Sequence, residues 1–290
     1  MKKLASLLLS GALALGLLAG CGGTPGTADT PAANTDTPAA PTQTGSLEGT
    51  TLKVGASPAP HAEILAVVKE LLAEEGINLE IVEFTDYIQP NTAVENGSID
   101  ANYFQHITYL NNFNAEQATH LVSVADLHYE PFGIYAGKTA SLEELQDGAQ
   151  IGVPNDPTNG GRALLLLQEQ GLITLEDGAG LEPTRLDIKD NPRGFEIVEM
   201  EAAQLPRSLD SLDLAVINGN YAIQAGLNVA DALAIEAADG TAGTAYVNVL
   251  AVAEGREEDP AIQALVAALE SDAVKTFMEE TYGGAVVPVF

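Results

Sequence analysis

The sequence of 290 residues contains no tryptophan, a single cysteine and only 12 lysine and arginine residues. One cysteine cannot form a disulfide within the chain, so the fold must depend on its apolar core. The 12 basic residues stand against 41 acidic ones, and the formal net charge is −29. Because a nucleic-acid-binding face needs a basic stripe, we expect no nucleic-acid partner. We also expect no attraction by charge to anionic lipid.

Motifs of the common enzyme classes are also missing. The chain has no Gly-x-Ser-x-Gly element and no phosphate-binding loop that ends in Gly-Lys-Ser or Gly-Lys-Thr. The histidines, at positions 61, 106, 120 and 128, show no spacing typical of a metal site. Asp126 and His128 would share one face of a strand, but no serine stands out as a third member of a triad. We therefore expect no catalysis, no metal and no cofactor.

The first 20 residues have the features of a secretory signal. Two lysines precede an apolar run at residues 4–19, which is shorter than the roughly 20 residues of a membrane-spanning helix. The run ends in Leu-Ala-Gly-Cys21, which resembles a lipobox. We predict cleavage before Cys21 and lipidation of its thiol. The lipid alone would then hold the chain at the outer face of the bacterial cell membrane. Loss of the two lysines changes the formal charge from −29 to −31.

Residues 21–46 are predicted to be a tether. After Cys21 this segment consists mainly of threonine, proline, alanine and glycine, and it holds no apolar residue larger than alanine. Such a composition buries too little surface to fold. The remaining 244 residues are enough for two lobes. We expect one lobe from residues 47–130 and 246–290, and the other from residues 131–245.

Short apolar strands alternate with amphipathic helices along residues 47–290. Apolar residues spaced by three and four from Ile64 to Leu72 predict a helix, which Gly76 ends. The alternation predicts an α/β fold with mostly parallel sheets and helices on both faces. In such sheets, ligands bind beyond the carboxyl ends of the strands. Further strands are predicted at residues 52–56, 79–84, 151–153 and 212–217, and further helices at 163–167, from 219 and at 262–269.

The segment at residues 154–162 lies between a predicted strand and a predicted helix. Asp156 or Thr158 can cap that helix, and Pro157 is tolerated in its first turn. The following glycines would expose backbone N–H groups to an anion at the positive end of the helix dipole. Arg162 adds a planar fork that can hold a carboxylate by two bonds. The alternative is a plain capped loop with Arg162 in a surface ion pair.

Aromatic and amide side chains form two further groups of candidates. Tyr87 and the aromatic residues of 102–109 would suit a small amphipathic ligand, although aromatic residues are often part of a core. Asn218 follows an apolar strand, and Asn248 lies within one. A buried amide needs a hydrogen-bond partner, which a ligand or a neighbouring loop would supply.

Taken together, these segments resemble the methionine-binding lipoproteins of the NLPA lipoprotein family, over about residues 52–286. The resemblance implies the two-lobed type II periplasmic-binding-protein fold, with a ligand closed between the lobes. It also implies a binding protein of an ABC importer, with a hinge near residues 127–136 and 244–249. The motifs are FTDY at 84–87, IDANYFQH at 99–106, VPNDPTN at 153–159, GR at 161–162, QLPRSL at 204–209, AVIN at 215–218, YVN at 246–248 and GGAV at 283–286.

The resemblance also implies roles for single residues. Arg162 is expected to bind the ligand carboxylate, while Asn218 and Asn248 bind the backbone polar groups of an amino acid, with Asn159 as a further member of the site. The side-chain pocket is expected to be lined by Tyr87, Phe104, His106 and Tyr109. L-methionine is the expected ligand, and a permease with its ATPase complex is the expected partner.

Three alternatives stay open from the sequence. The chain could be a receptor for another small apolar amino acid or a short peptide. It could be a surface adhesin or signalling lipoprotein that kept the fold and lost transport. It could also be an acyl-transfer enzyme that depends on His106 or His128.

Overall fold

The computed structural model describes residues 47–237 and 242–290. The predicted signal peptide, the lipidation site at Cys21 and the tether up to residue 46 lie outside the described residues. Within the two described ranges, no helix is both long and apolar enough to cross a membrane.

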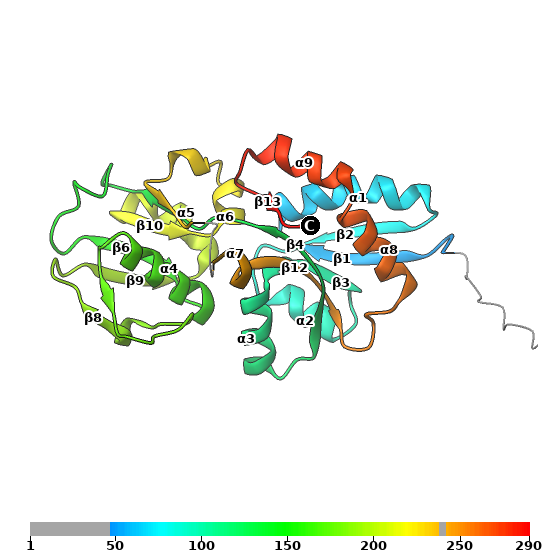
Figure 1. The fold of residues 1–290 in the computed structure, drawn as a ribbon, viewed down its shortest axis with the longest axis horizontal. Coiled ribbons are helices and arrows are strands. Elements are labelled where there is room, and N and C mark those ends of the chain that lie inside the picture. Colours follow the sequence, from blue (N-terminus) through cyan, green and yellow to red (C-terminus); the bar gives the residue numbers. More distant parts are fainter. Residues whose placement is uncertain (1–46, 238–241) are drawn as a thin grey trace, which may run out of the picture. The chain divides into compact units, whose positions relative to one another are not determined.

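The described residues form two main sheets, each with its own helices (Figure 1). The first sheet has six strands in the order β13-β4-β12-β3-β1-β2. We call this sheet and the helices that cover it the six-stranded lobe. Its strands are β1 (Thr51–Ala56), β2 (Asn78–Glu83), β3 (Ala101–His106), β4 (Leu121–Tyr129), β12 (Val247–Ala253) and β13 (Val287–Pro288).

The second sheet has five strands in the order β11-β5-β10-β6-β9, and together with its helices it forms the five-stranded lobe. A separate two-stranded sheet pairs β7 (Thr174–Leu175) with β8 (Ile188–Asp190). The strands of the second sheet are β5 (Gly133–Ala136), β6 (Gln150–Pro154), β9 (Glu196–Met200), β10 (Leu214–Ile217) and β11 (Ala234–Ile235).

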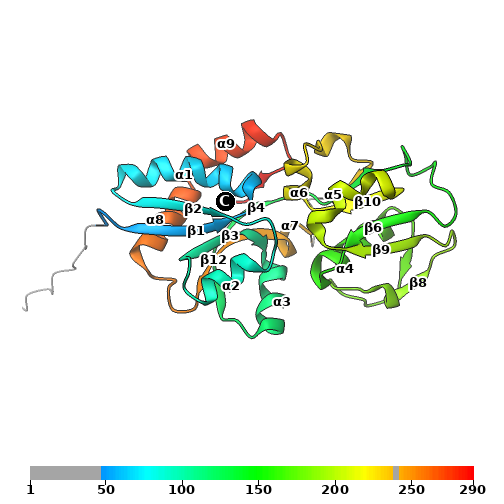
Figure 2. The ribbon, with the colours of Figure 1, turned by 180° about the vertical axis from the view of Figure 1, so that it is seen from behind.

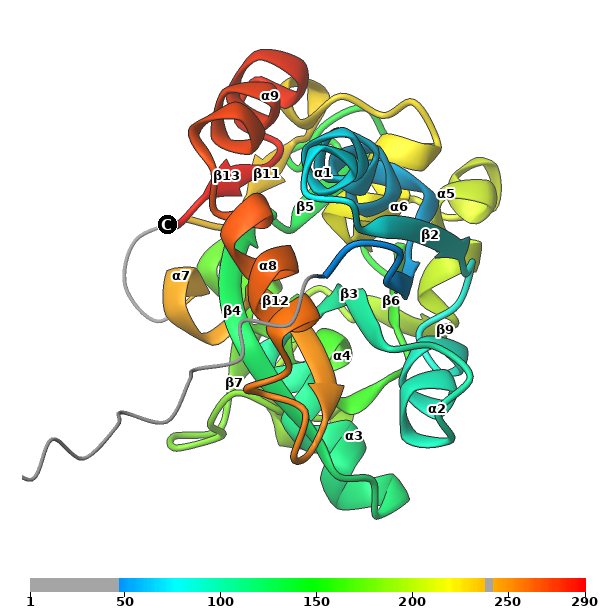
Figure 3. The same ribbon diagram turned by 90° about the vertical axis from the view of Figure 1, so that its right-hand side faces the viewer.

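Helices cover both faces of the six-stranded sheet (Figure 3). One face packs against α1 (Glu63–Glu74), α8 (Pro260–Leu269) and α9 (Asp272–Tyr282), and the other against α2 (Gln89–Glu95) and α3 (Ile107–Gln117). Because side chains alternate along a strand, Leu250 and Val252 of β12 enter the first core while Val249 and Ala251 enter the second. A strand buried on both faces needs such a continuous apolar run.

The five-stranded sheet is built in the same way. Helix α4 (Pro157–Glu169) packs its leucines on one face, and α5 (Leu205–Ser208) and α6 (Gly219–Gln224) lie on the other. The short helix α7 (Ala242–Ala245) precedes β12. The predicted α/β fold with helices on both faces of the sheets is therefore confirmed.

The prediction of mostly parallel sheets is wrong, because both sheets are mixed. In the six-stranded sheet, the parallel pairs are β1 with β2 and β1 with β3. The pairs formed by β12 and by β13 are antiparallel. In the other sheet, β6 has parallel partners and β5 has antiparallel ones. The expected lobe boundaries already had the chain leave near residue 130 and return near residue 246. The strand pattern did not reveal that β4 and β12, at these two crossings, pair antiparallel.

Two adjacent segments thus link the lobes (Figure 2). Residues 130–132 connect β4 to β5, and the chain returns through α7 into β12. At this end of the sheet His128 is paired with Asn248 and Tyr129 with Val247. Polar side chains at the ends of β4 and β12 are therefore brought to the place where the lobes meet.

Candidate functional site

A narrow cavity is lined by residues of both lobes. All eight side chains expected to contact a ligand lie on it: Tyr87, Phe104, His106, Tyr109, Asn159, Arg162, Asn218 and Asn248. They come from the loop after β2, from β3, α3, α4 and β12, and from the N-cap of α6. The ends of strands and the starts of helices therefore supply most of the cavity.

Four lining residues were not expected from the sequence: Gln105, Glu130, Gly219 and Asn220. Gln105 is next to His106 and Gly219 is next to Asn218, and Asn220 is two positions from Asn218. Glu130 follows the Asp126 and His128 pair that was considered as a fragment of a triad. In the structure Asp126 is exposed, and His128 is buried with Glu130 as its partner. Proximity in sequence was the only available signal for these four residues.

The start of α4 places Asn159 and Arg162 in the cavity. Asp156 is the N-cap, as predicted, and its carboxylate accepts the Asn159 backbone N–H at 2.9 Å, with Pro157 next in the chain. The expected anion site on the glycine N–H groups is wrong. Asp156 itself caps the helix, and the Gly160 N–H donates to the Asp156 carbonyl oxygen at 2.8 Å. A side chain rather than the helix terminus must therefore bind a ligand anion here.

Arg162 is 3% exposed and is already held from several sides. Its Nε donates to both carboxylate oxygens of Glu236, and its Nη2 donates to Glu236 and to the Glu130 carbonyl oxygen at 2.9 Å. The ring of Tyr246 lies 4.2 Å from the guanidinium carbon. Burial alone would lower the pKa of Arg162, but the charge of Glu236 raises it, so the guanidinium stays charged. These bonds use Nε and Nη2, and Nη1 takes part in none of them.

Two amides of the cavity have opposite polarity. Asn218 Nδ2 donates to Asn159 Oδ1 at 2.7 Å, while Asn218 Oδ1 is buried and has no partner among the described residues. Asn248 Oδ1 accepts the His61 Nε2–H at 3.0 Å, which leaves its Nδ2 as a donor. Because a buried polar atom needs a partner, Asn218 calls for a ligand donor, and Asn248 is suited to a ligand acceptor.

His106 joins the two lobes through Asn159. Its Nδ1 accepts the Tyr109 backbone N–H at 3.0 Å, so the proton is on Nε2, which donates to Asn159 Oδ1 at 3.2 Å. Asn159 Oδ1 therefore accepts from one residue of each lobe, His106 and Asn218. This arrangement holds the cavity closed around its polar end.

Aromatic rings form the apolar wall. Tyr87 lies 5.9 Å from Phe104 and 5.7 Å from Tyr109, measured between ring centroids, and 4.9 Å from Tyr221 of the five-stranded lobe. The Tyr87 hydroxyl donates to Asn220 at 2.5 Å. The wall thus includes contacts across the lobes as well as a lining for an apolar ligand group.

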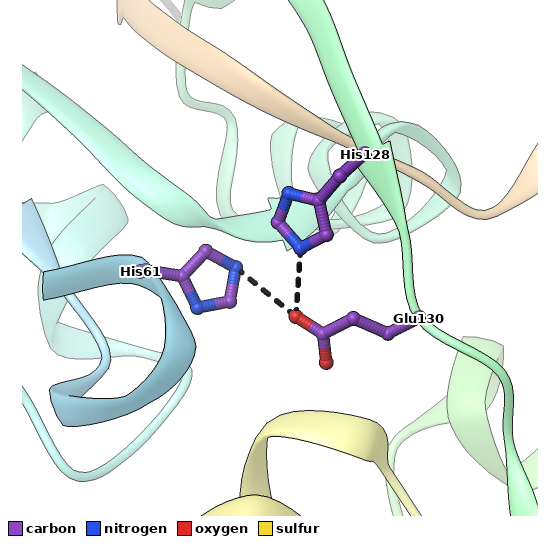
Figure 4. A group of neighbouring side chains, drawn as sticks. All are labelled: His61, His128 and Glu130. Carbon is purple, nitrogen blue, oxygen red and sulfur yellow. Dashed lines mark hydrogen bonds and ion pairs between the residues drawn. The ribbon is translucent and has the colours of Figure 1, made fainter. Parts of the chain in front are cut away.

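Behind the cavity, His61, His128 and Glu130 meet (Figure 4). One ligand atom from each residue lies within 4.8 Å of the others, so this group has the donor set of a metal site. The sequence spacing did not suggest it, because His61 is 67 positions away from His128 and is brought there only by the fold. Burial lowers the pKa of His61 to about 4 and that of His128 to about 3, and burial raises the pKa of Glu130.

The buried histidines should make the protein less stable in mild acid. Burial, with the charge of Arg162, lowers the pKa of His106 to about 3, whereas an unfolded histidine titrates near 6.5. Below pH 6.5 the unfolded chain binds protons that the folded chain does not, so stability falls as the pH falls. For His106 the loss between pH 7 and pH 5 is about 2 kcal/mol. Buried Glu130 and Asp156, whose pKa values are raised, act in the opposite direction.

Urea unfolding at pH 7 and pH 5 tests this expectation. His106→Gln should lose about 2 kcal/mol less than the wild type over this range, since it lacks one buried titrating group. His120→Gln is the matched control, because the side chain of His120 is 69% exposed. If His106→Gln shows the same pH dependence as the wild type, the histidine is not held neutral in the fold.

Two α/β lobes, joined by two adjacent segments and lining one polar cavity, define a substrate-binding protein of the type II class. The sequence pattern described as NlpA lipoprotein matches residues 52–290. The chain belongs to this family. It is therefore a substrate-binding lipoprotein and not an enzyme, and a lipid anchor is the family's means of membrane association.

Known relatives cover nearly all of the described residues. The D-methionine-binding lipoprotein MetQ of Salmonella typhimurium is 43% identical over 240 residues, which are 81% of this chain and 87% of that protein. A lipoprotein from Ruminococcus gnavus is 56% identical with a TM-score of 0.82, over 83% of this chain and all of the other. A nutrient-binding protein from Burkholderia cenocepacia, solved bound to methionine, is 42% identical with a TM-score of 0.79, over 82% of this chain and all of the other.

Proposed function

We propose that this protein binds a free α-amino acid with an apolar side chain, methionine foremost, and delivers it to an ABC permease. The polarity of the cavity is the observation that supports this most directly. Arg162 Nη1 and Asn248 Nδ2 are donors suited to a carboxylate. Asn218 Oδ1 and the Glu130 carboxylate are acceptors suited to an ammonium group. A zwitterion supplies both partners at once.

The aromatic wall supports methionine among the apolar amino acids. Tyr87, Phe104 and Tyr109 surround the remaining part of the cavity. A thioether gains up to about 1.5 kcal/mol from each contact with an aromatic ring. The family resemblance implied L-methionine, while several relatives carry the name of the D enantiomer, so both enantiomers belong in the test.

The anchor and the lobes fit the same function. We propose that lipid on Cys21 holds the protein at the outer face of the cell membrane, where residues 22–46 let it reach a permease whose ATPase is a separate chain. We further propose that the lobes divide near residues 130/131 and 245/246 and close on the ligand. A ligand that contacts both lobes favours the closed form by differential affinity.

Calorimetry on the detergent-solubilised chain, unfolded and refolded to remove bound ligand, tests the proposal. L-methionine or D-methionine should bind with saturable heat, and N-acetyl-methionine should bind at least about 10-fold more weakly because it lacks the ammonium group. Leucine and a methionine-containing dipeptide test the alternative ligands. Absence of heat with both enantiomers would refute methionine as the ligand.

A further inference from the structure

Two buried histidines stand directly behind the cavity without lining it. His61 belongs to the single turn η1 (Pro58–Ala62), and His128 lies near the end of β4. They are 1% and 0% exposed. Both point their Nε2 atoms at one oxygen of Glu130, Oε1, at 3.5 Å from His61 and 2.8 Å from His128 (Figure 4). A residue of the cavity is therefore held from behind by two side chains that a ligand does not reach.

His128 is a donor to Glu130 because its other nitrogen is occupied. Its Nδ1 is bonded to the buried Tyr103 hydroxyl at 2.5 Å. A tyrosine hydroxyl donates readily to a neutral imidazole nitrogen, which places the imidazole proton on Nε2. Burial lowers the pKa of His128 and of His61, so each ring is neutral and carries one N–H. The histidines orient the carboxylate without neutralising it.

The second oxygen of Glu130, Oε2, lies at the start of α6, where the Asn220 backbone N–H bonds the carboxylate (Figure 4). A Cβ atom built on Gly219 would lie 2.7 Å from Glu130 Oε2, and Gly219 lines the cavity. The glycine thus makes room for this oxygen. No lysine or arginine within residues 47–237 and 242–290 forms an ion pair with Glu130, since Arg162 is paired with Glu236 and bonds only the Glu130 backbone. A buried carboxyl group without a cationic partner either takes up a proton, as its raised pKa favours, or binds a cation from the ligand.

His61 also sets the polarity of Asn248. The same Nε2–H that faces Glu130 lies 3.0 Å from Asn248 Oδ1. If the amide were rotated by 180°, two N–H donors would face each other, so the oxygen stays toward His61 and Nδ2 toward the ligand. The hydrogen bond of His61 is therefore the one to Asn248, and its contact with Glu130 at 3.5 Å is longer, while the Nε2–H of His128 bonds Glu130 at 2.8 Å.

We propose that His61 and His128 are positioning residues that orient Glu130 and Asn248 and thereby make the cavity selective for a free α-ammonium group next to a carboxylate. This inference rests on the proposed function. It distinguishes the two histidines: His128 serves the ammonium end through Glu130, and His61 serves the carboxylate end through Asn248.

Binding of L-methionine and of 4-(methylthio)butanoate, its analogue without the amino group, tests the inference on the full-length chain in detergent. His128→Met should weaken L-methionine about 10-fold to 100-fold, the range for a bond to a charged group, and should change the analogue less than about 3-fold. His61→Met should weaken both ligands. His61→Gln and His128→Gln keep an N–H near the position of Nε2 and should recover most of the affinity. If a methionine variant does not fold, the glutamine variant still tests the inference.

Several results would overturn the inference. One is a folded His128→Met that binds L-methionine like the wild type, and another is an equal loss for both ligands. Glutamine variants no better than the methionine variants would exclude positioning by an N–H. Binding that is lost with EDTA and restored by zinc would show that the group holds a metal instead. If the wild type binds neither L-methionine nor the analogue, the proposed ligand itself is overturned. If the wild type binds L-methionine and the variants bind it equally well, only this inference is overturned.

Discussion

Arg162→Met is expected to reduce methionine binding by at least about 100-fold and to lower the free energy of unfolding by about 3–5 kcal/mol. The loss of binding follows from removing the charged donor for the carboxylate. The loss of stability has a separate cause, because Glu236 is 8% exposed and would remain buried without its cation. Tyr129, whose hydroxyl donates to Glu236 at 2.6 Å, cannot replace a charge.

A second substitution separates these two effects. Arg162→Met combined with Glu236→Gln removes both charges, so most of the stability should return, since replacing a whole buried ion pair is often neutral. Binding should not return. Arg162→Lys is the control for charge, and it should also bind weakly because one ammonium cannot serve Glu236, the Glu130 carbonyl and a ligand together. Urea unfolding and calorimetry measure the two quantities. Full affinity in the double variant would exclude Arg162 as the carboxylate ligand.

Tyr87→Ala is expected to weaken methionine binding by about 3 kcal/mol, roughly 100-fold. The ring contacts Phe104 and Tyr109 in the six-stranded lobe and Tyr221 in the other, so its loss opens the side-chain pocket and removes a contact that favours closure.

Tyr87→Phe is the matched variant. It keeps the ring and loses only the hydrogen bond to Asn220, so the expected loss is about 1 kcal/mol, or about 5-fold. Calorimetry with the two variants side by side measures the difference. Equal affinities for the alanine and phenylalanine variants would mean that the hydroxyl, and not the aromatic surface, is what the ligand requires.

The features that were predicted well depend on short-range chemistry. Asp156 or Thr158 was predicted to cap the helix because a side-chain oxygen there satisfies the free N–H groups of the first turn, and the structure shows that Asp156 makes this bond. The strand before Asn218 and the strand around Asn248 followed from runs of β-branched and apolar residues. Local patterns of this kind singled out Arg162, Asn218 and Asn248 before the fold was known, and the resemblance to the family supplied the complete set of eight candidate residues.

The ion pair of Arg162 and the contact of His61 with Asn248 were missed because they join partners far apart in the chain. Glu236 lies 74 positions from Arg162, and His61 lies 187 positions from Asn248. No local pattern identifies such a partner, because the distance between the two side chains is set by the packing of whole lobes. The mixed direction of the sheets escaped prediction for the same reason, since β12 pairs with strands far from it in the chain.

The sequence by itself determined which residues were candidates for the cavity, because capping and strand patterns together with the family motifs singled them out. It also determined the family and the predicted lipid anchor, which rest on ordered motifs. Only the tertiary structure decided which polar atoms of the cavity are already bonded within the protein. An amide is both donor and acceptor until a neighbour takes one of its groups. Asn159 takes the Nδ2 of Asn218 and His61 takes the Oδ1 of Asn248, and so two identical side chains become an acceptor and a donor in one site.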